Sequence, residues 1–290
     1  MSGTIVAMPA SAPSAVVLDM EGVLHVGFEP LPGAVAAVAE LRRQGRRLAI
    51  LTNTTGKSRR LIAERLAAAG FAFAAAEIVT AASATADHLR ARHAGRGVLL
   101  LAEPGAREEF EGVRLVAAGA DADVVCIGGP DDGFTYARLQ DAFRALLRGA
   151  PLVAMQRNRW WPTASGPGLD AGLYVRGLEY AAGRRAHVVG KPSPAVYRAA
   201  LVRCGARPAE ALMVGDDLVS DLRTARRIGM STCLVRTGKG GGFSPSPGEV
   251  DLDVPALADL PTALGPVPSR SSFSPNLTRA APQPGGSPRA

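Results

Sequence analysis

Four apolar runs, each ending in polar or charged residues, constrain the fold of this chain more than any other feature. They are AVVLD at 15–19, LAILTN at 48–53, HVVGK at 187–191 and ALMVGDD at 211–217. Between them, helical patterns that each stop at a glycine occupy 31–45, 58–70 and 193–205. Strands that are apolar throughout and alternate with helices indicate an α/β fold with a parallel sheet covered on both faces.

A second set of strand and helix patterns lies inside the first. Its apolar runs occupy 97–103, 122–129 and 150–156, and its helical patterns lie near 83–94, 134–148 and 172–182. We interpret 83–185 as an inserted α/β domain that divides a core domain into 14–82 and 186–262. The ends, 1–13 and 263–290, are expected to be disordered; the second is rich in proline, serine and glycine and has little to bury.

Composition excludes several classes of protein. The net charge is +7, but the arginines are scattered and not gathered in one basic run with aromatic residues, so no nucleic-acid partner is expected. No apolar run approaches the roughly 18 residues that mark a membrane span. The first residues lack the basic and apolar regions of a secretory signal, so we expect a cytoplasmic protein. Three widely spaced cysteines predict free thiols, with no disulfide framework or zinc site.

Asp19, at the end of the first run, is the candidate nucleophile. The carboxyl ends of parallel strands meet at one edge of a sheet, where ligands bind, so the four polar endings should converge on one crevice. A carboxylate held against phosphorus there can form an aspartyl phosphate. Gly22 lets the chain turn sharply behind it. An isolated aspartate would more simply cap a turn, so the catalytic interpretation depends on what accompanies Asp19.

Three aspartates follow another apolar run: Asp216, Asp217 and Asp221. Buried acids need a cation or hydrogen-bond donors to compensate them. Mg²⁺ binds through one or two carboxylates together with phosphate and water, which suits Asp19 and Asp216. For Asp221, a role at the start of the following helix, where an acid complements the helix dipole, stays open.

Three further residues are suited to phosphate. Thr52 and Asn53 offer a hydroxyl and an amide beside the start of a helix. Lys191 is one of three lysines among 33 basic residues. A compact ammonium neutralises phosphate where a planar guanidinium does not fit. The nearby TTGKS is not a P-loop, because Leu51 stands where that motif requires glycine.

Taken in order, DMEGVL at 19–24, LTN at 51–53, GKPSP at 190–194 and GDDLVSD at 215–221 resemble the four motifs of the haloacid dehalogenase superfamily. The inserted domain lies between the second and third motifs, as in the IIA subclass. Over 14–262 the resemblance implies a Rossmann-like parallel-sheet core with an inserted C2-type cap that closes over the crevice and chooses the substrate. It also implies a Mg²⁺-dependent phosphohydrolase.

The resemblance implies a role for each site residue. Asp19 would be the nucleophile and a metal ligand, with the backbone carbonyl of Glu21 and the carboxylate of Asp216 as further ligands. The transferring phosphoryl group would be held by Thr52, Asn53 and Lys191, with Asp217 or Asp221 in support. Chemistry of this type is mostly positioning and charge neutralisation.

Glu21 departs from the pattern, since many phosphatases of the superfamily carry aspartate there as general acid and base. Its carboxylate lies one C–C bond, about 1.5 Å, further out, and a misplacement of about 1 Å can cost roughly 100-fold in rate. We expect a competent hydrolase, one that could be slow, acting on a small phosphorylated metabolite, a phosphoamino acid or pyrophosphate. The alternative is a phosphoryl-ligand-binding or regulatory protein with little turnover. Transfer to an acceptor other than water also stays open.

One stretch of the inserted domain could reach the crevice and choose the substrate. It contains Arg157, Asn158, Arg159, Trp160 and Trp161. The two tryptophans could equally pack within that domain or form the surface of a homodimer.

Overall fold

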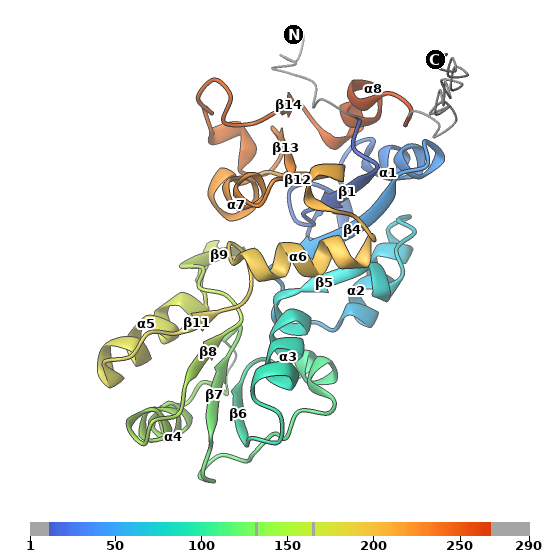
Figure 1. Ribbon diagram of the computed structural model, residues 1–290. Coiled ribbons are helices and arrows are strands. Elements are labelled where there is room, and N and C mark those ends of the chain that lie inside the picture. Colours follow the sequence, from blue (N-terminus) through green and yellow to red (C-terminus); the bar gives the residue numbers. More distant parts are fainter. Residues whose placement is uncertain (1–11, 131–132, 164–165, 268–290) are drawn as a thin grey trace, which may run out of the picture.

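Two parallel sheets organise the chain in the computed structural model, which describes residues 12–130, 133–163 and 166–267 (Figure 1). The larger sheet has the strand order β14-β13-β12-β1-β4-β5, and its neighbouring strands run parallel. Its strands are β1 (Ala15–Leu18), β4 (Arg47–Thr52), β5 (Ile78–Thr80), β12 (Ala211–Gly215), β13 (Ser231–Val235) and β14 (Leu252–Val254). The predicted α/β fold with a parallel-sheet core is confirmed.

Helices cover both faces of the larger sheet, because its strands are apolar on both sides. Val16 and Leu18 of β1 pack toward one face, and Ala15 and Val17 pack toward the other. The first face is covered by α1 (Ala34–Arg43), α2 (Arg59–Ala68) and α8 (Leu260–Leu264), and the second by α3 (Ala81–Arg92), α6 (Pro194–Arg203) and α7 (Arg223–Arg227). The edge where the strands end is therefore held between two packed layers.

The second sheet has the order β11-β8-β7-β6 and is also parallel. Its strands are β6 (Val98–Leu101), β7 (Val124–Ile127), β8 (Leu152–Ala154) and β11 (His187–Val188). One face packs against α4 (Tyr136–Leu147) and α5 (Ala171–Ala182), and the other packs against α3. In Figure 1 this sheet forms the lower half of the molecule, with α6 between the two halves and α3 beside β6.

Short elements complete the fold. The hairpins are β2 (His25–Val26) with β3 (Glu29–Pro30), and β9 (Trp160–Thr163) with β10 (Gly166–Leu169). The 3₁₀ segments are η1 (Ala75–Glu77), η2 (Pro104–Phe110), η3 (Pro208–Glu210), η5 (Gly240–Gly242) and η6 (Leu257–Asp259), and η4 (Leu218–Leu222) is a π-helical segment.

One expectation about the sheets is wrong. The run at 187–191 does not form a strand of the larger sheet, because β11 pairs with β8 at the edge of the second sheet. Apolar character indicates that a strand is buried but does not say in which sheet.

The division into a core and an inserted domain stays a prediction. β11 lies just past the expected boundary at 185, and α3 packs against both sheets.

The ends of the chain were expected to be disordered. α8 extends to Leu264, two residues into the range 263–290. Residues 1–11 and 268–290 lie outside the described part, so the prediction is untested there.

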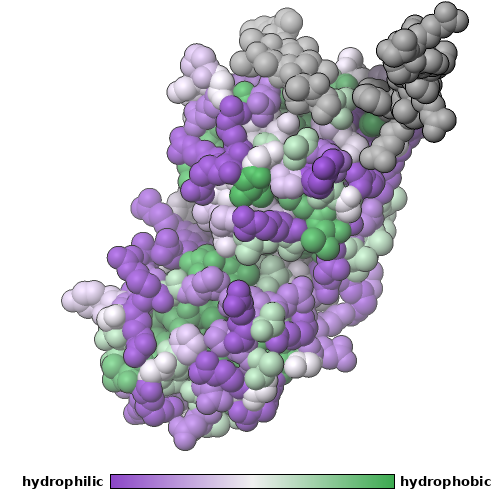
Figure 2. Space-filling view, viewed as in Figure 1, coloured by the Kyte–Doolittle hydropathy of each residue, from purple (hydrophilic) through white to green (hydrophobic). Residues whose placement is uncertain are grey.

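Among the described residues, none of the helices has the length and apolar character to cross a membrane. Hydrophilic residues cover most of the face in Figure 2, and apolar residues gather where the two halves meet.

Candidate active site

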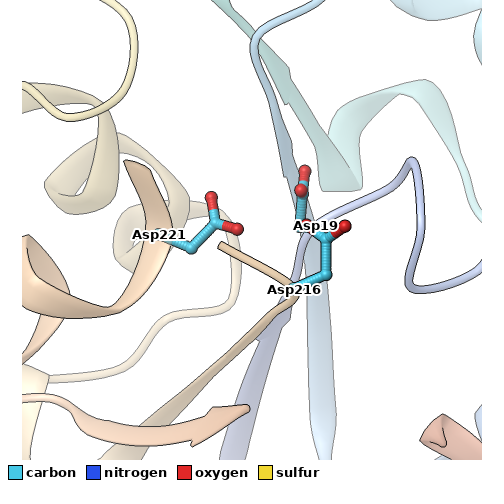
Figure 3. Close-up of side chains that lie close together, drawn as sticks. All are labelled: Asp19, Asp216 and Asp221. Carbon is cyan, nitrogen blue, oxygen red and sulfur yellow. The ribbon is translucent and has the colours of Figure 1, made fainter. Parts of the chain in front are cut away.

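Three aspartates meet at the carboxyl edge of the larger sheet. Strand β1 pairs in parallel with both β4 and β12, so the residues that follow these strands emerge side by side. Asp19 directly follows β1, and Asp216 directly follows β12. Asp221 extends from η4 toward both of them (Figure 3). Carboxylate oxygens of the three side chains all lie within 4.8 Å of one another.

The environment of these acids suits a hard cation. Asp19, Asp216 and Asp221 are buried, with 8%, 4% and 0% of their surface exposed. Burial, with the nearby charge of Asp19, raises the pKa of Asp216 to about 6. Burial also raises the pKa of Asp221 to about 7, although Lys191 opposes this. Converging carboxylates that are costly to ionise together are stabilised by a divalent cation, and an all-oxygen donor set is the one that Mg²⁺ prefers.

Lys191 supplies the positive charge at this site. Its Nζ lies 2.8 Å from Oδ1 of Asp19 and 2.7 Å from Oδ1 of Asp221. Burial by itself would lower the pKa of Lys191, but the charges of Asp19 and Asp221 outweigh this and raise it. The side chain therefore stays an ammonium, and buried charges of this kind persist only when they are paired.

Asn53 connects Lys191 to the larger sheet. Its Nδ2 donates a hydrogen bond of 3.1 Å to the carbonyl of Lys191, and its Oδ1 accepts one of 2.8 Å from the N–H of Lys191. Both polar groups of the amide are thus engaged by one peptide backbone. Because Lys191 follows β11 of the second sheet, these two bonds tie it to the end of β4. The sequence predicted Asn53 as a phosphate ligand, whereas the structure directs its side chain to Lys191.

Thr52 lies at the end of β4, on the strand next to Asp19, and 5% of its surface is exposed. Its hydroxyl oxygen lies 2.9 Å from the hydroxyl oxygen of Thr54 and accepts a hydrogen bond of 3.3 Å from the N–H of Thr54. The hydroxyl is thereby fixed at the same edge as the acids. It remains suited to donating to a phosphoryl oxygen.

Glu21 is held by the β2–β3 hairpin. Its Oε1 accepts a hydrogen bond of 2.9 Å from the N–H of Gly27, and its Oε2 lies 3.2 Å from Nδ1 of His25. Burial raises the pKa of Glu21, but the bonds from His25 and Gly27 and the charges of His25 and Lys57 lower it by more. The net pKa is below the ordinary value. Glu21 is therefore a carboxylate near neutral pH, with both oxygens engaged by the hairpin.

The structure distinguishes the two acids that the sequence left as alternatives. Oδ1 of Asp217 accepts hydrogen bonds of 2.9 and 3.0 Å from the N–H groups of Val219 and Ser220, so this oxygen caps η4. Its Oδ2 lies 3.4 Å from Nζ of Lys239. Asp221, and not Asp217, belongs to the carboxylate group with Asp19 and Asp216.

The segment after β13 makes two contacts at this site that were not predicted from the sequence. The hydroxyl of Thr237 donates a hydrogen bond of 2.6 Å to the carbonyl of Gly22. The N–H of Lys239 donates one of 2.8 Å to Oδ2 of Asp216. A signal was present, because RTGKGGG at 236–242 directly follows an apolar run and contains one of the three lysines.

The stretch expected to choose the substrate begins beside Lys191. The N–H of Gly190 donates a hydrogen bond of 2.8 Å to the carbonyl of Met155, just before that stretch. Its described members are exposed: Arg157, Asn158, Arg159 and Trp160. The side chain of Trp161 lies outside the described part.

Comparisons of sequence agree with the motifs. A family model described as Haloacid dehalogenase-like hydrolase matches residues 16–115, and one described as HAD-hydrolase-like matches 188–250. Phospholysine phosphohistidine inorganic pyrophosphate phosphatase of Rattus norvegicus is 37% identical over 230 residues, which cover 77% of this chain and 83% of the relative. Haloacid dehalogenase-like hydrolase domain-containing protein 2 of Rattus norvegicus is 37% identical over 225 residues, covering 78% and 85%.

Comparisons of structure agree with the fold. The 4-nitrophenylphosphatase of Thermotoga maritima superposes with a TM-score of 0.80 at 26% identity, covering 88% of this chain and 98% of that one. NagD from E. coli K-12 gives a TM-score of 0.76 at 27% identity, covering 86% and 98%. Ordered motifs, a shared fold and relatives that align over most of their length lead to one conclusion: this chain belongs to the haloacid dehalogenase-like hydrolases.

Proposed function

We propose that this chain is a Mg²⁺-dependent phosphatase in which Asp19 attacks a small phosphorylated substrate. The observation that carries the proposal is the contact of the Lys191 ammonium with both Asp19 and Asp221, beside Asp216. Phosphoryl transfer requires a positioned nucleophile and positive charge around the phosphoryl oxygens. The names of the relatives support this activity, since one is a phosphatase of phospholysine, phosphohistidine and pyrophosphate, and another is a 4-nitrophenylphosphatase.

Asp19, Asp216 and the backbone carbonyl of Glu21 would hold the Mg²⁺ ion. The oxygen chemistry of these groups and the raised pKa of Asp216 fit such a cation. When bound, the ion would supply positive charge to the phosphoryl oxygens and orient them. Asp221 would hold Lys191 in place beside it.

In the first half of the reaction, a carboxylate oxygen of Asp19 bonds to phosphorus while the bond from phosphorus to the leaving oxygen breaks. In the second half, Glu21 accepts a proton from water, the water oxygen bonds to phosphorus, and the bond to Asp19 breaks. Lys191 and Thr52 hold the phosphoryl oxygens throughout. Because the pKa of Glu21 is lowered, few molecules carry the proton that would assist a leaving oxygen. The site therefore favours substrates with good leaving groups, such as aryl phosphates and pyrophosphate.

We further propose that 83–185 acts as a cap that closes over this site and excludes bulk water, other than the water that the second half of the reaction consumes. The exposed Arg157 and Arg159, on the stretch that begins beside Lys191, would attract a second anionic group of the substrate. Homodimerisation through the cap stays a prediction. Trp160, Leu169 and Leu173 offer apolar surface for it, with 52%, 62% and 51% exposed.

Phosphate release from p-nitrophenyl phosphate, with Mg²⁺ and with a chelator, tests the function. We expect release that depends on Mg²⁺, no release by Asp19→Asn, and an acid-stable phosphoryl label on Asp19 of the quenched wild type. Asp87→Asn, at an exposed aspartate of α3, is the matched control and should behave as wild type. An unchanged rate in Asp19→Asn would exclude the covalent route. Tight binding of phosphate esters without turnover on a broad panel would favour the binding-protein alternative.

A further inference from the structure

The segment Thr237–Lys239, here named the clamp segment, lies against two of the expected metal ligands. It follows β13, which pairs in parallel with β12, so it emerges at the same edge of the sheet as Asp216. One hydrogen bond joins it to the loop after β1, through Thr237 and Gly22, and another joins it to Asp216, through Lys239. Neither Thr237 nor Lys239 is needed for the chemistry described above.

At Asp216, the clamp segment determines which oxygen faces a cation. Oδ2 accepts the N–H of Lys239 at 2.8 Å. The same oxygen lies so close to Gly22 and Gly238 that a methyl group on either glycine would overlap it, and both glycines have positive φ, of 79° and 56°. Oδ2 is therefore enclosed by backbone, which leaves Oδ1 as the oxygen free to bind a metal.

At the nucleophile loop, the clamp segment fixes the backbone that carries the second ligand. The peptide between Glu21 and Gly22 has its orientation set by the N–H of Gly22, which donates to the carbonyl of His25 at 2.8 Å. The next carbonyl, that of Gly22, accepts the hydroxyl of Thr237 at 2.6 Å. With both sides of Gly22 held, the peptide that carries the carbonyl of Glu21 has little freedom to rotate.

We propose that the clamp segment is a positioning element for the metal site, and that the Thr237 hydroxyl sets the affinity for Mg²⁺. Only the identity of the metal rests on the proposed function. Groups that orient metal ligands without touching the metal typically change metal affinity by about 10–100-fold when they are removed. The ammonium of Lys239 contributes less, because its side chain is 61% exposed and lies 3.4 Å from Asp217.

Metal binding without substrate tests this proposal. Mg²⁺ binding is measured by calorimetry, and Mn²⁺ binding by the electron paramagnetic resonance of the free ion. We expect Thr237→Val to weaken both by about 10–100-fold and Thr237→Ser, which keeps the hydroxyl, to restore the affinity. In turnover, Thr237→Val should need more Mg²⁺ for half-maximal rate and reach the wild-type kcat at saturating Mg²⁺.

The control is Thr232→Val at the opposite end of β13, where the Thr232 hydroxyl donates to Asp251 at 2.9 Å. It removes this hydrogen bond and the one of 3.3 Å that the hydroxyl accepts from the N–H of Asp251, and it should leave metal affinity at the wild-type value. If Thr237→Val does not fold, Thr237→Ala removes the same hydroxyl with more space. A folded Thr237→Val or Thr237→Ala that binds Mg²⁺ as tightly as wild type would overturn the clamp alone. A wild type that binds neither ion would overturn the metal site as well.

Discussion

The Nζ atom of Lys191 lies 2.8 Å from a carboxylate oxygen of Asp19, although the two residues follow strands of different sheets. Asp19 follows β1 of the larger sheet, and Lys191 follows β11 of the second. Both side chains are buried, and the ammonium of Lys191 also contacts Asp221. The candidate active site thus joins the two halves of the molecule through one ammonium group.

Lys191→Met should lose both stability and activity. It removes the charge that compensates two buried carboxylates, a change that typically costs about 3–5 kcal/mol of unfolding free energy, and it removes a group that neutralises the phosphoryl oxygens, worth about 10²–10³ in kcat. Urea unfolding and phosphate release measure the two effects. Arg207→Met, at a side chain that is 83% exposed, is the control for charge and should change neither. A Lys191→Met protein as stable as wild type would mean that the ion pairs do not form.

Asn53→Leu should act through Lys191. It removes both hydrogen bonds to the Lys191 backbone, so the ammonium shifts, and a shift of about 1 Å costs roughly 100-fold in rate. Because Asn53 acts only through Lys191, adding Asn53→Leu to Lys191→Met should cause little further loss of kcat. A double mutant whose losses multiply would instead place the Asn53 amide directly on the substrate.

Asp216→Asn should stabilise the metal-free protein in a manner that depends on pH. The folded-state pKa of Asp216 is raised from 3.8 to about 6, so ionised Asp216 destabilises the folded state fully above about pH 6, and this cost shrinks as the pH falls from about 6 toward 3.8. With a chelator, the variant should melt at a higher temperature than wild type at about pH 8, and the difference should shrink toward about pH 5. Adding Mg²⁺ should raise the melting temperature of the wild type alone. A variant that melts lower than wild type at both pH values would show that ionised Asp216 is not costly.

Glu21→Gln should slow turnover by about 10²–10⁴-fold, the usual worth of a general acid or base. Glu21→Asp, which returns the side chain common in the family, should keep or raise the rate. The loss of rate in each variant is measured with an aryl phosphate and with an alkyl phosphate. Only the alkyl phosphate, which has the poorer leaving group, needs a proton from residue 21. Glu29→Gln, at an exposed position in the same hairpin, is the control. Wild-type rates for Glu21→Gln on both substrates would remove Glu21 from proton transfer.

Much of the fold and site could be predicted because it is local. Glycines stop helices near the predicted residues, with α1, α2 and α6 ending just before Gly45, Gly70 and Gly205. Apolar runs mark β1, β4 and β12, and Asp19 and Asp216 follow their strands at one edge. That convergence follows from parallel pairing alone, since strands that run the same way present their carboxyl ends together.

The surroundings of the site could not be predicted in the same way. Glu21 is placed by a two-strand hairpin whose strands are two residues each, too short for a hydrophobic period to indicate. Whether Asp217 or Asp221 faces Asp19 depends on the π-helical turn of η4, which shifts the side chains relative to an α-helix. Thr237 was overlooked because its partner is Gly22, 215 residues away in the chain.

The sequence by itself determined the type of each long element, the order of the motifs and the chemistry available at the strand ends, because these follow from neighbouring residues and their periodicity. Only the tertiary structure decided which sheet receives β11, how Lys191 reaches Asp19, and that the Asn53 amide binds a backbone 138 residues away. The physical reason is that such contacts depend on how separate elements pack. Packing is a property of the whole chain, and no local pattern of residues records it.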